Sequence, residues 1–163
     1  MIETALRISN HTVSHNVLEK IVQYGKDLLE KPIELLEGVE ETLHMLKSSF
    51  RIVVATKGDL LDQERKLKKS GLENYFHHIE IMSDKQESDY GKLIRHLDIK
   101  PAEFLMIGNS LKSDIMPVLA LGGHGVHVPY HTTWAHEKTE HKIEHPNFRQ
   151  VQSIKEILPD LLF

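Results

Sequence analysis

The spacing of apolar residues changes after the first thirty-odd residues of the chain. Up to about residue 31 the apolar positions recur at helical spacing, with Thr12 or Ser14 suited to an N-cap, and Pro32 ends this segment. From Gly38 onward, short apolar runs of the kind found in buried strands alternate with stretches that have one apolar helical face. We therefore predict helices alone before Gly38, and alternating strands and helices after it.

The apolar runs predicted to be strands are 51–55, 78–82, 104–107, 125–128 and 148–151. A helix should begin at about Asp59, turn Leu60, Leu61 and Leu67 inward and close at Gly71 in a left-handed turn. Another helix is expected from Ser153 to about residue 162. Strands that alternate with helices of about ten residues imply right-handed crossovers, so we predict an α/β fold with a parallel sheet.

Polar residues just after the strands are the candidates for chemistry, because ligands of parallel sheets bind beyond the carboxyl ends of the strands. Thr56, Lys57 and Gly58 follow the first run, where a hydroxyl and backbone N–H groups can bind an anion. An ordinary capping turn explains the same residues. Lys85 follows the second run and can neutralise a phosphate or hold a carboxylate, although a loop lysine is commonly just solvated. Lys92 is a rival, but it falls inside the following helix.

The third run ends in a denser group of polar residues. Gly108 lets the chain turn, Asn109 and Ser110 follow it, and Asp114 comes about one helical turn later. Side-chain oxygens of Asn and Asp suit Mg²⁺, a hard ion that keeps several waters and bridges to phosphate. A capping residue at 109 or 110, with Asp114 as partner of the helix dipole, explains each residue singly. This capping interpretation explains less well why three successive strand ends carry phosphate-compatible groups.

Composition narrows the classes of protein. The 163 residues suit one domain, or one domain with an appendage. The formal net charge of −4 argues against nucleic acid as a partner, and the absence of cysteine excludes disulfides and thiol catalysis. No apolar stretch approaches the roughly 20 residues that span a bilayer. The first residues do not read as a secretory leader, so we expect a cytoplasmic protein with no membrane partner.

Histidine is frequent in one stretch of the chain, which contains His124, His127, His131, His136, His141 and His145. A zinc site is one explanation, since imidazole is a common Zn²⁺ ligand. However, no cysteine assists, and Pro129 interrupts any helix that would join His127 to His131. The alternative is a strand that leads into a loop at the rim of the sheet. His131 and Trp134, together with Ser110, are then candidate rim residues that contact substrate or a covering element.

Taken in order, these motifs resemble the haloacid dehalogenase-like hydrolase superfamily, most of whose members are Mg²⁺-dependent phosphatases. Thr56 falls where the second family motif has its phosphate-binding hydroxyl, and Lys85 falls where the third has its lysine. Residues 106–114 resemble the fourth, acidic motif, which is the most specific match. The resemblance covers about residues 38–128 and implies a three-layer, Rossmann-like parallel sheet, with 37–163 as its core.

Residues 1–36 resemble the distal part of the helical cap that many members insert after their first strand. Such a cap closes over small phosphorylated metabolites, which are therefore the expected substrates. The resemblance makes Thr56 and Lys85 catalytic residues that also bind phosphate, with Lys57 and Gly58 beside them. It makes Asn109 and Asp114 ligands of Mg²⁺, although many members have aspartate where this chain has asparagine.

The family's nucleophile and general acid form an Asp-x-Asp motif at the end of an apolar first strand. The aspartates of this chain are at 27, 59, 62, 84, 89, 98, 114 and 160, and no two are separated by a single residue. In the family fold, the strand that bears this motif lies between the strand ending at Thr56 and the strand ending near Gly108. Its loss would leave two strands with unpaired backbone groups.

We therefore hypothesise that the sequence is part of a longer or truncated hydrolase whose nucleophile lies outside this chain, so that this chain alone is inactive. In a second version of this hypothesis, another chain or a second copy of this one supplies or covers the absent strand. One alternative is a non-catalytic phosphate-binding or interaction module that has lost its nucleophile. Another is a metal-binding protein that uses the histidine-rich stretch.

Overall fold

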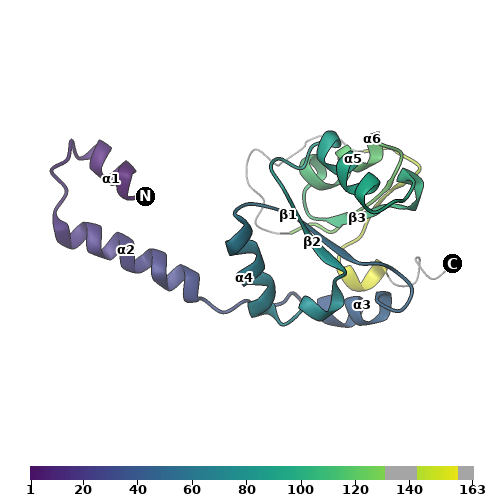
Figure 1. The fold of residues 1–163 in the computed structure, drawn as a ribbon, viewed down its shortest axis with the longest axis horizontal. Helices are drawn as coiled ribbons and strands as arrows, with labels where there is room; N and C mark the ends of the chain where they lie inside the picture. The colour runs from purple at the N-terminus through teal and green to yellow at the C-terminus, as the bar shows by residue number, and fades with distance from the viewer. Residues whose placement is uncertain (131–142, 158–163) are drawn as a thin grey trace. The chain divides into compact units, whose positions relative to one another are not determined.

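The computed structural model describes residues 1–130 and 143–157, which belong to two compact units. The first unit, Met1–Glu34, contains α1 (Ile2–Ile8) and α2 (His15–Glu30) and no strand (Figure 1). Ser14 is the N-cap residue of α2, although its side chain makes no capping hydrogen bond. Neither helix buries a residue, and Val17, Val22, Leu28 and Leu29 of α2 are exposed.

The strands of the described residues all belong to the second unit, Leu35–Phe163. β1 (Val53–Lys57) and β2 (His78–Met82) pair in parallel, with Thr56 opposite Ile81. A second parallel sheet has the order β3 (Leu105–Gly108), β4 (His124–His127) and β5 (Phe148–Gln150). Within the described residues β1 and β3 do not pair, so each sheet has an open edge there. The break lies at the position where the resemblance predicts a further strand between β1 and β3.

The helices of the second unit are α3 (Val39–Leu46), α4 (Leu60–Ser70), α5 (Glu87–His96) and α6 (Met116–Ala120). Short 3₁₀ turns cover Glu73–Tyr75 (η1), Pro101–Glu103 (η2) and Ile154–Ile157 (η5), and a π-helical turn covers Leu111–Ile115 (η3). The predicted helix after Ser153 is a 3₁₀ turn as far as Ile157, and residues 158–162 of that prediction lie outside the described residues. No helix in the described part of the chain is long and apolar enough to cross a bilayer.

The prediction for α4 is right at its ends and wrong along its first turn. The Asp59 carboxylate caps the helix by accepting the Asp62 N–H at 3.1 Å, and Gly71 closes it with φ +73°. Leu60 and Leu61, however, are 54% and 73% exposed. The reason is that α4 buries no residue at all, and of the three leucines predicted to face inward only Leu67 is half-buried.

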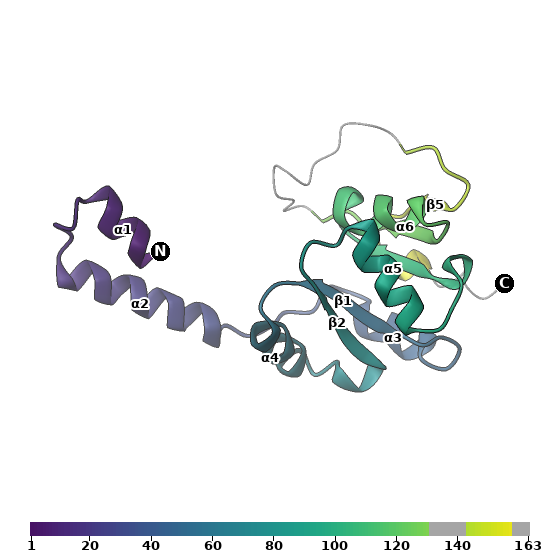
Figure 2. The same cartoon turned by 45° about the horizontal axis from the view of Figure 1, so that its top comes forward.

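The main hydrophobic core is built around α5, which contacts α6 and lies between α6 and the β1–β2 pair in Figure 2. Tyr90, Leu93 and Ile94 of α5 are almost fully buried, in contact with a cluster that includes Met106 of β3 and the half-buried Val53 and Ala55 of β1.

A second cluster contains Val126 and Ile157 and receives Leu105 and Ile107, the neighbours of Met106 along β3. Because alternate residues of β3 enter different clusters, this strand is covered on both faces. The fold is therefore α/β and Rossmann-like, with apolar layers on both sides of parallel strands, as the sequence predicts.

Candidate functional site

The turn after β3 is shaped around the Asp114 carboxylate. In the π-helical turn η3, the Ile115 N–H reaches back to the Ser110 carbonyl at 3.2 Å. Asp114 Oδ2 accepts the Ser110 N–H at 3.0 Å, and the Ser110 hydroxyl accepts the Ser113 N–H at 3.0 Å. Ser110 is therefore the N-cap residue, and the carboxylate lies against the carboxyl end of β3. Isolated π turns of this kind recur at functional sites.

Gly108 is required by this close approach. A Cβ at this position would lie 2.6 Å from Asp114 Cγ, a separation that real side chains do not adopt. The steric conflict involves a carboxylate that is 6% exposed and hydrogen-bonded to the backbone, so it has little room to move away. Glycine at 108 thus serves the position of Asp114 rather than only the turn of the chain.

Lys85, which follows β2, meets Asp114 at this place. Its Nζ lies 2.6 Å from Asp114 Oδ1, and the two side chains are only 14% and 6% exposed. The Lys85 backbone has φ +55°, a left-handed conformation that residues other than glycine seldom adopt. The rival Lys92 lies on α5 with its side chain 69% exposed, where it pairs with Asp89 at 3.5 Å. Of these two lysines, Lys85 is therefore the one that reaches the strand ends.

Thr56 and Gly58 both lie close to Gln63, a residue that the sequence does not single out. The Thr56 hydroxyl donates to Gln63 Oε1 at 3.0 Å from the end of β1. Gly58 has φ +138°, and a Cβ there would lie 2.9 Å from Gln63 Nε2. The Lys57 ammonium lies 2.5 Å from Asp84 Oδ1 in a pair whose side chains are more than half exposed. The Lys57 side chain is therefore at the surface, whereas the Thr56 hydroxyl is part-buried.

The buried Tyr90 holds the η3 turn through a hydrogen bond, a role that the sequence does not indicate. Its ring is fully buried in the core, and its hydroxyl donates to the Ser113 carbonyl at 3.1 Å. Burial raises the pKa of Tyr90 far above its usual range, and the nearby Asp114 carboxylate raises it further. The phenol therefore stays protonated and remains a donor at every pH at which the protein is studied.

His127 supports the other side of the turn. It is 9% exposed, and its Nε2 lies 3.1 Å from the Asn109 carbonyl. Because a carbonyl only accepts, Nε2 carries a proton, and Nδ1 is left to accept a hydrogen bond from the side-chain amide of Gln150, which lies 3.1 Å away. The backbone of Asn109 is thus fixed while its side chain is exposed. His127 has a hydrogen-bonding role in the fold, which neither the zinc hypothesis nor the rim-loop hypothesis requires.

The remaining part of the histidine-rich stretch gives little further detail. His145 Nδ1 accepts the Asn147 N–H at 3.1 Å. His131 and Trp134, the candidate rim residues of the loop, lie outside the described residues, as do His136 and His141. Among the described residues, a group of two histidines and a glutamate that could jointly hold a metal ion lies outside this stretch, on β2 and α5.

The donor set at the end of β3 fits Mg²⁺ chemically, although only in part. Both Asp114 oxygens already accept a donor, but each keeps lone-pair capacity for a second partner. The exposed Asn109 adds an oxygen without charge, and the Lys85 ammonium offsets the one carboxylate. These residues therefore suit a Mg²⁺ site that shares its ion with other carboxylates.

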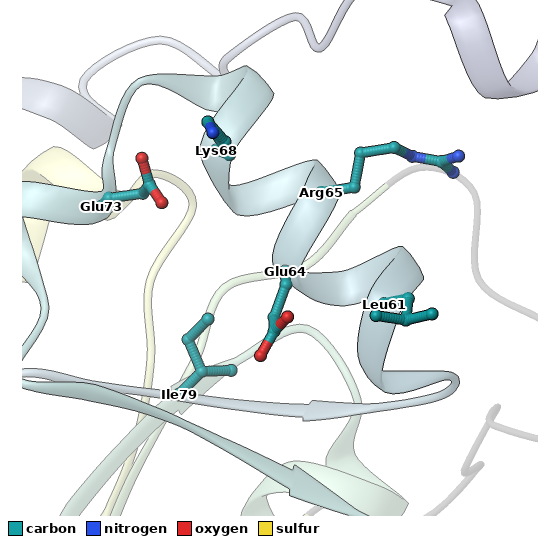
Figure 3. Close-up of a pocket in the computed structure, with 6 residues that line it drawn as sticks. All are labelled: Leu61, Glu64, Arg65, Lys68, Glu73 and Ile79. Carbon is teal, nitrogen blue, oxygen red and sulfur yellow. The ribbon is translucent and has the colours of Figure 1, made fainter.

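A separate hollow on the surface lies between α4 and β2, and Figure 3 shows its lining. Glu64 and Ile79 point toward one another across it, whereas Arg65 points outward. The residues that line it are Leu61, Glu64, Arg65, Lys68, Glu73 and Ile79. It contains none of the predicted site residues, and Arg65 is already paired with Asp62 at 2.5 Å. We therefore do not assign the candidate site to this hollow.

Comparison with known proteins agrees with this geometry. The sequence model of the haloacid dehalogenase-like hydrolase family matches residues 1–124, which include the helices of the first unit and the strand ends described above. A haloacid dehalogenase-like family hydrolase from Xanthomonas campestris is 33% identical, with a TM-score of 0.85 over 99% of this chain and 64% of that chain. A search of curated proteins finds no match.

More distant structures share the fold alone. A predicted phosphoglycolate phosphatase from Haemophilus somnus 129pt has 17% identity and a TM-score of 0.67, covering 97% of this chain and 72% of that chain. The hydrolase YfnB from Bacillus subtilis, bound to magnesium, has 18% identity and a TM-score of 0.65, covering 80% and 57% of the two chains. The present chain spans 64% of the length of the Xanthomonas protein. Because the family's sequence model matches most of the chain, the chain belongs to the haloacid dehalogenase-like hydrolase family.

Proposed function

We propose that the chain is part of a Mg²⁺-dependent phosphomonoesterase whose nucleophilic aspartate lies outside these 163 residues. The observation that carries this proposal is the ion pair between Lys85 Nζ and Asp114 Oδ1, 2.6 Å long and nearly buried where β2 and β3 end. Desolvation makes a buried ion pair a poor source of stability. A cation held by a carboxylate at strand ends is, in contrast, what stabilisation of a transferring phosphoryl group needs.

The chemistry implied by the family proceeds through an aspartyl-phosphate. The first aspartate of Asp-x-Asp forms a bond to phosphorus while the bond to the substrate's ester oxygen breaks. The second aspartate gives that oxygen a proton and later takes one from the water that hydrolyses the intermediate. Mg²⁺, when bound, would neutralise charge on the phosphoryl oxygens.

This chain's own residues would hold the phosphoryl group in place. The Lys85 ammonium neutralises an oxygen of the group, and Asp114 keeps that ammonium at the strand ends. The Thr56 hydroxyl, now donated to Gln63, turns to donate to a second oxygen. Backbone N–H groups of Lys57 and Gly58 add donors at the same turn. The Lys57 side chain stays with Asp84 at the surface.

The break between the two sheets supports a source for the nucleophile outside this sequence. β1 and β3 contribute side chains to one core, yet they do not pair with each other among the described residues. Backbone groups at such edges need partners, and a strand that ends in Asp-x-Asp would supply them. The 64% coverage of the Xanthomonas protein agrees with a longer complete enzyme. A second chain, or a second copy of this one, is the other source of such a strand.

We assign residues 1–36 to the distal part of a helical cap that admits a small phosphorylated metabolite. The exposed apolar side chains of α2 include Val17, Val22, Leu28 and Leu29. An apolar stripe on a helix that buries no residue is typical of an element that packs against further structure. In the complete protein, we expect the proximal part of the cap to cover this stripe.

The test joins the family's apolar first strand, its Asp-x-Asp and the proximal part of a cap ahead of Met1, to give what we call the joined protein. We expect no hydrolysis of p-nitrophenyl phosphate by the isolated chain and Mg²⁺-dependent hydrolysis by the joined protein. Lys85→Met should lower kcat by about 10²–10³, as loss of a transition-state donor does. Lys92→Met, on the exposed face of α5, should not lower kcat.

Other outcomes would contradict the proposal. Hydrolysis by the isolated chain that depends on Lys85 would place the nucleophile within these residues. A folded but inactive joined protein, with an isolated chain that binds inorganic phosphate, would favour the non-catalytic module. The absence of Asp-x-Asp from the sequence is the observation that keeps that second function in view.

A further inference from the structure

Side chains able to hold a metal ion meet at the start of β2. His78 and Glu80 are two residues apart on this strand, so they project from the same face. His96 is the last residue of α5, and its ring centroid lies 5.5 Å from that of His78. Met82, on the same face of β2, belongs to one hydrophobic cluster with Leu93 and Ile94 of α5. The Glu80 Oε2 atom lies 3.7 Å from His78 Nε2 and 3.9 Å from His96 Nδ1. The ligand atoms of the three side chains all lie within 4.8 Å of one another.

This group is distinct from the phosphate site. His78 begins β2, whereas Lys85 lies in the loop beyond Met82, the last residue of the same strand. A strand rises by about 3.3 Å per residue, so the length of β2 separates the two places by more than about 10 Å. The two imidazoles and one carboxylate also differ in kind from the oxygen donors near Asp114.

His78 is the residue that most needs an explanation. Its Nε2 is buried and has no hydrogen-bond partner among the described residues. Its Nδ1 lies 2.9 Å from His77 Nδ1, so one of these two nitrogens carries the shared proton. When His78 is the donor, its Nε2 has a free lone pair that faces Glu80 and His96. A buried polar atom without a partner costs free energy, and a bound ion would satisfy it.

We propose that His78, Glu80 and His96 form a Zn²⁺ site that ties β2 to the end of α5. Zn–N and Zn–O bonds of about 2.0–2.2 Å place tetrahedral ligands roughly 3.3–3.6 Å apart, so the 3.7 and 3.9 Å separations from Glu80 need small contractions. The two imidazole nitrogens lie within 4.8 Å of each other and need a contraction of up to about 1.5 Å. A water molecule takes the fourth position. His77 acts as the outer partner that sets the His78 tautomer. Mg²⁺ and Ca²⁺ prefer all-oxygen sites, so they are not expected here.

Isothermal titration of the full chain with Zn²⁺ tests this proposal. We expect one Zn²⁺ to bind at this site, and Glu80→Gln and His96→Ala each to weaken its affinity by more than about tenfold, the least that losing an outer partner costs. His96 is 70% exposed, so its replacement should leave the fold intact. The exposed His44 of α3 gives the matched control, and His44→Ala should bind Zn²⁺ as tightly as the unaltered chain.

A thermal melt adds a readout that surface binding would not move. Zn²⁺ should raise the Tm of the unaltered chain and of His44→Ala, because it binds only the folded state, and should leave the Tm of His96→Ala unchanged. Unchanged Zn²⁺ affinity in both Glu80→Gln and His96→Ala would overturn the proposal. So would a loss of affinity caused by replacing His131, His136 and His141 together, since the ion would then bind in the histidine-rich stretch.

Discussion

Replacing Lys85 by methionine would leave the Asp114 carboxylate at 6% exposure without its cation. The Ser110 N–H, at 3.0 Å, would still donate to it, but a single amide does not replace an ammonium group. Removing one partner of a fully buried ion pair costs about 3–5 kcal/mol, and exposed pairs contribute about 0–1 kcal/mol. Lys85 is 14% exposed, so we expect Lys85→Met to lower the free energy of unfolding by about 2–4 kcal/mol.

A double-mutant cycle isolates the interaction from the loss of packing. Asp114→Asn keeps the size of the side chain and an oxygen for the Ser110 N–H, and the double variant removes both charges. We expect a coupling free energy of about 1.5–3 kcal/mol, so the double variant should be more stable than the sum of the single changes implies. Urea unfolding followed by circular dichroism measures all four proteins.

The exposed pair of Lys57 with Asp84 is the matched control. Its side chains are 56% and 58% exposed, so its coupling should stay below about 1 kcal/mol. A coupling below about 0.5 kcal/mol for Lys85 and Asp114, or one equal to that of the control pair, would refute the claim that these residues form a nearly buried pair.

Other expectations concern the turn, the metal and the open edges. Gly108→Ala should destabilise the fold by about 1–3 kcal/mol in urea unfolding, because its Cβ meets Asp114, whereas Gly91→Ala on α5 should not destabilise it. Calorimetry should show that the isolated chain binds Mg²⁺ at least roughly tenfold more weakly than the joined protein, since Asp114 is the one carboxylate that we place at the site among the described residues; equal affinities would contradict this. Sedimentation should show that the isolated 18.8 kDa chain self-associates through the open edges of β1 and β3, whereas the joined protein is monomeric. A monomeric isolated chain would count against exposed edges.

The alternation of strands and helices could be predicted because local patterns determine it. The run 78–82 is β2 to the residue, and α5 buries Tyr90, Leu93 and Ile94, which share one helical face in the sequence. The outward position of Leu60 and Leu61 could not be predicted in this way. An apolar helical face shows which side is suited to burial, but not whether a neighbour is present to cover it.

The candidate site was predicted as separate residues, and the contacts between them come from the fold. The sequence placed Lys85 and Asp114 at strand ends without showing that they pair. Gln63, Tyr90 and His127 were missed because their partners belong to other elements, two of them being backbone carbonyls, which no local pattern records. The π turn is defined by the bond from the Ile115 N–H to the Ser110 carbonyl, which helical periodicity alone does not indicate.

The sequence indicates the group of His78, Glu80 and His96 only in part. The spacing of His78 and Glu80 places both on one face of a strand, which period-two reasoning can detect. His96 belongs to the next helix, and only the packing of α5 on β2 brings it to them. A histidine at the exposed end of a helix is ordinarily solvated, so the sequence alone gives no reason to join it to the strand.

Amide hydrogen exchange would show most directly whether a strand bearing the nucleophile fits between β1 and β3. Amides on the open edges of Val53–Lys57 and Leu105–Gly108 should exchange rapidly in the isolated chain, because no strand in the part of the chain that the structure describes pairs with these edges. In the joined protein, we expect both strands to become protected together, while β5 at the far edge of its sheet is unchanged. A folded joined protein in which either β1 or β3 stays unprotected would contradict this account.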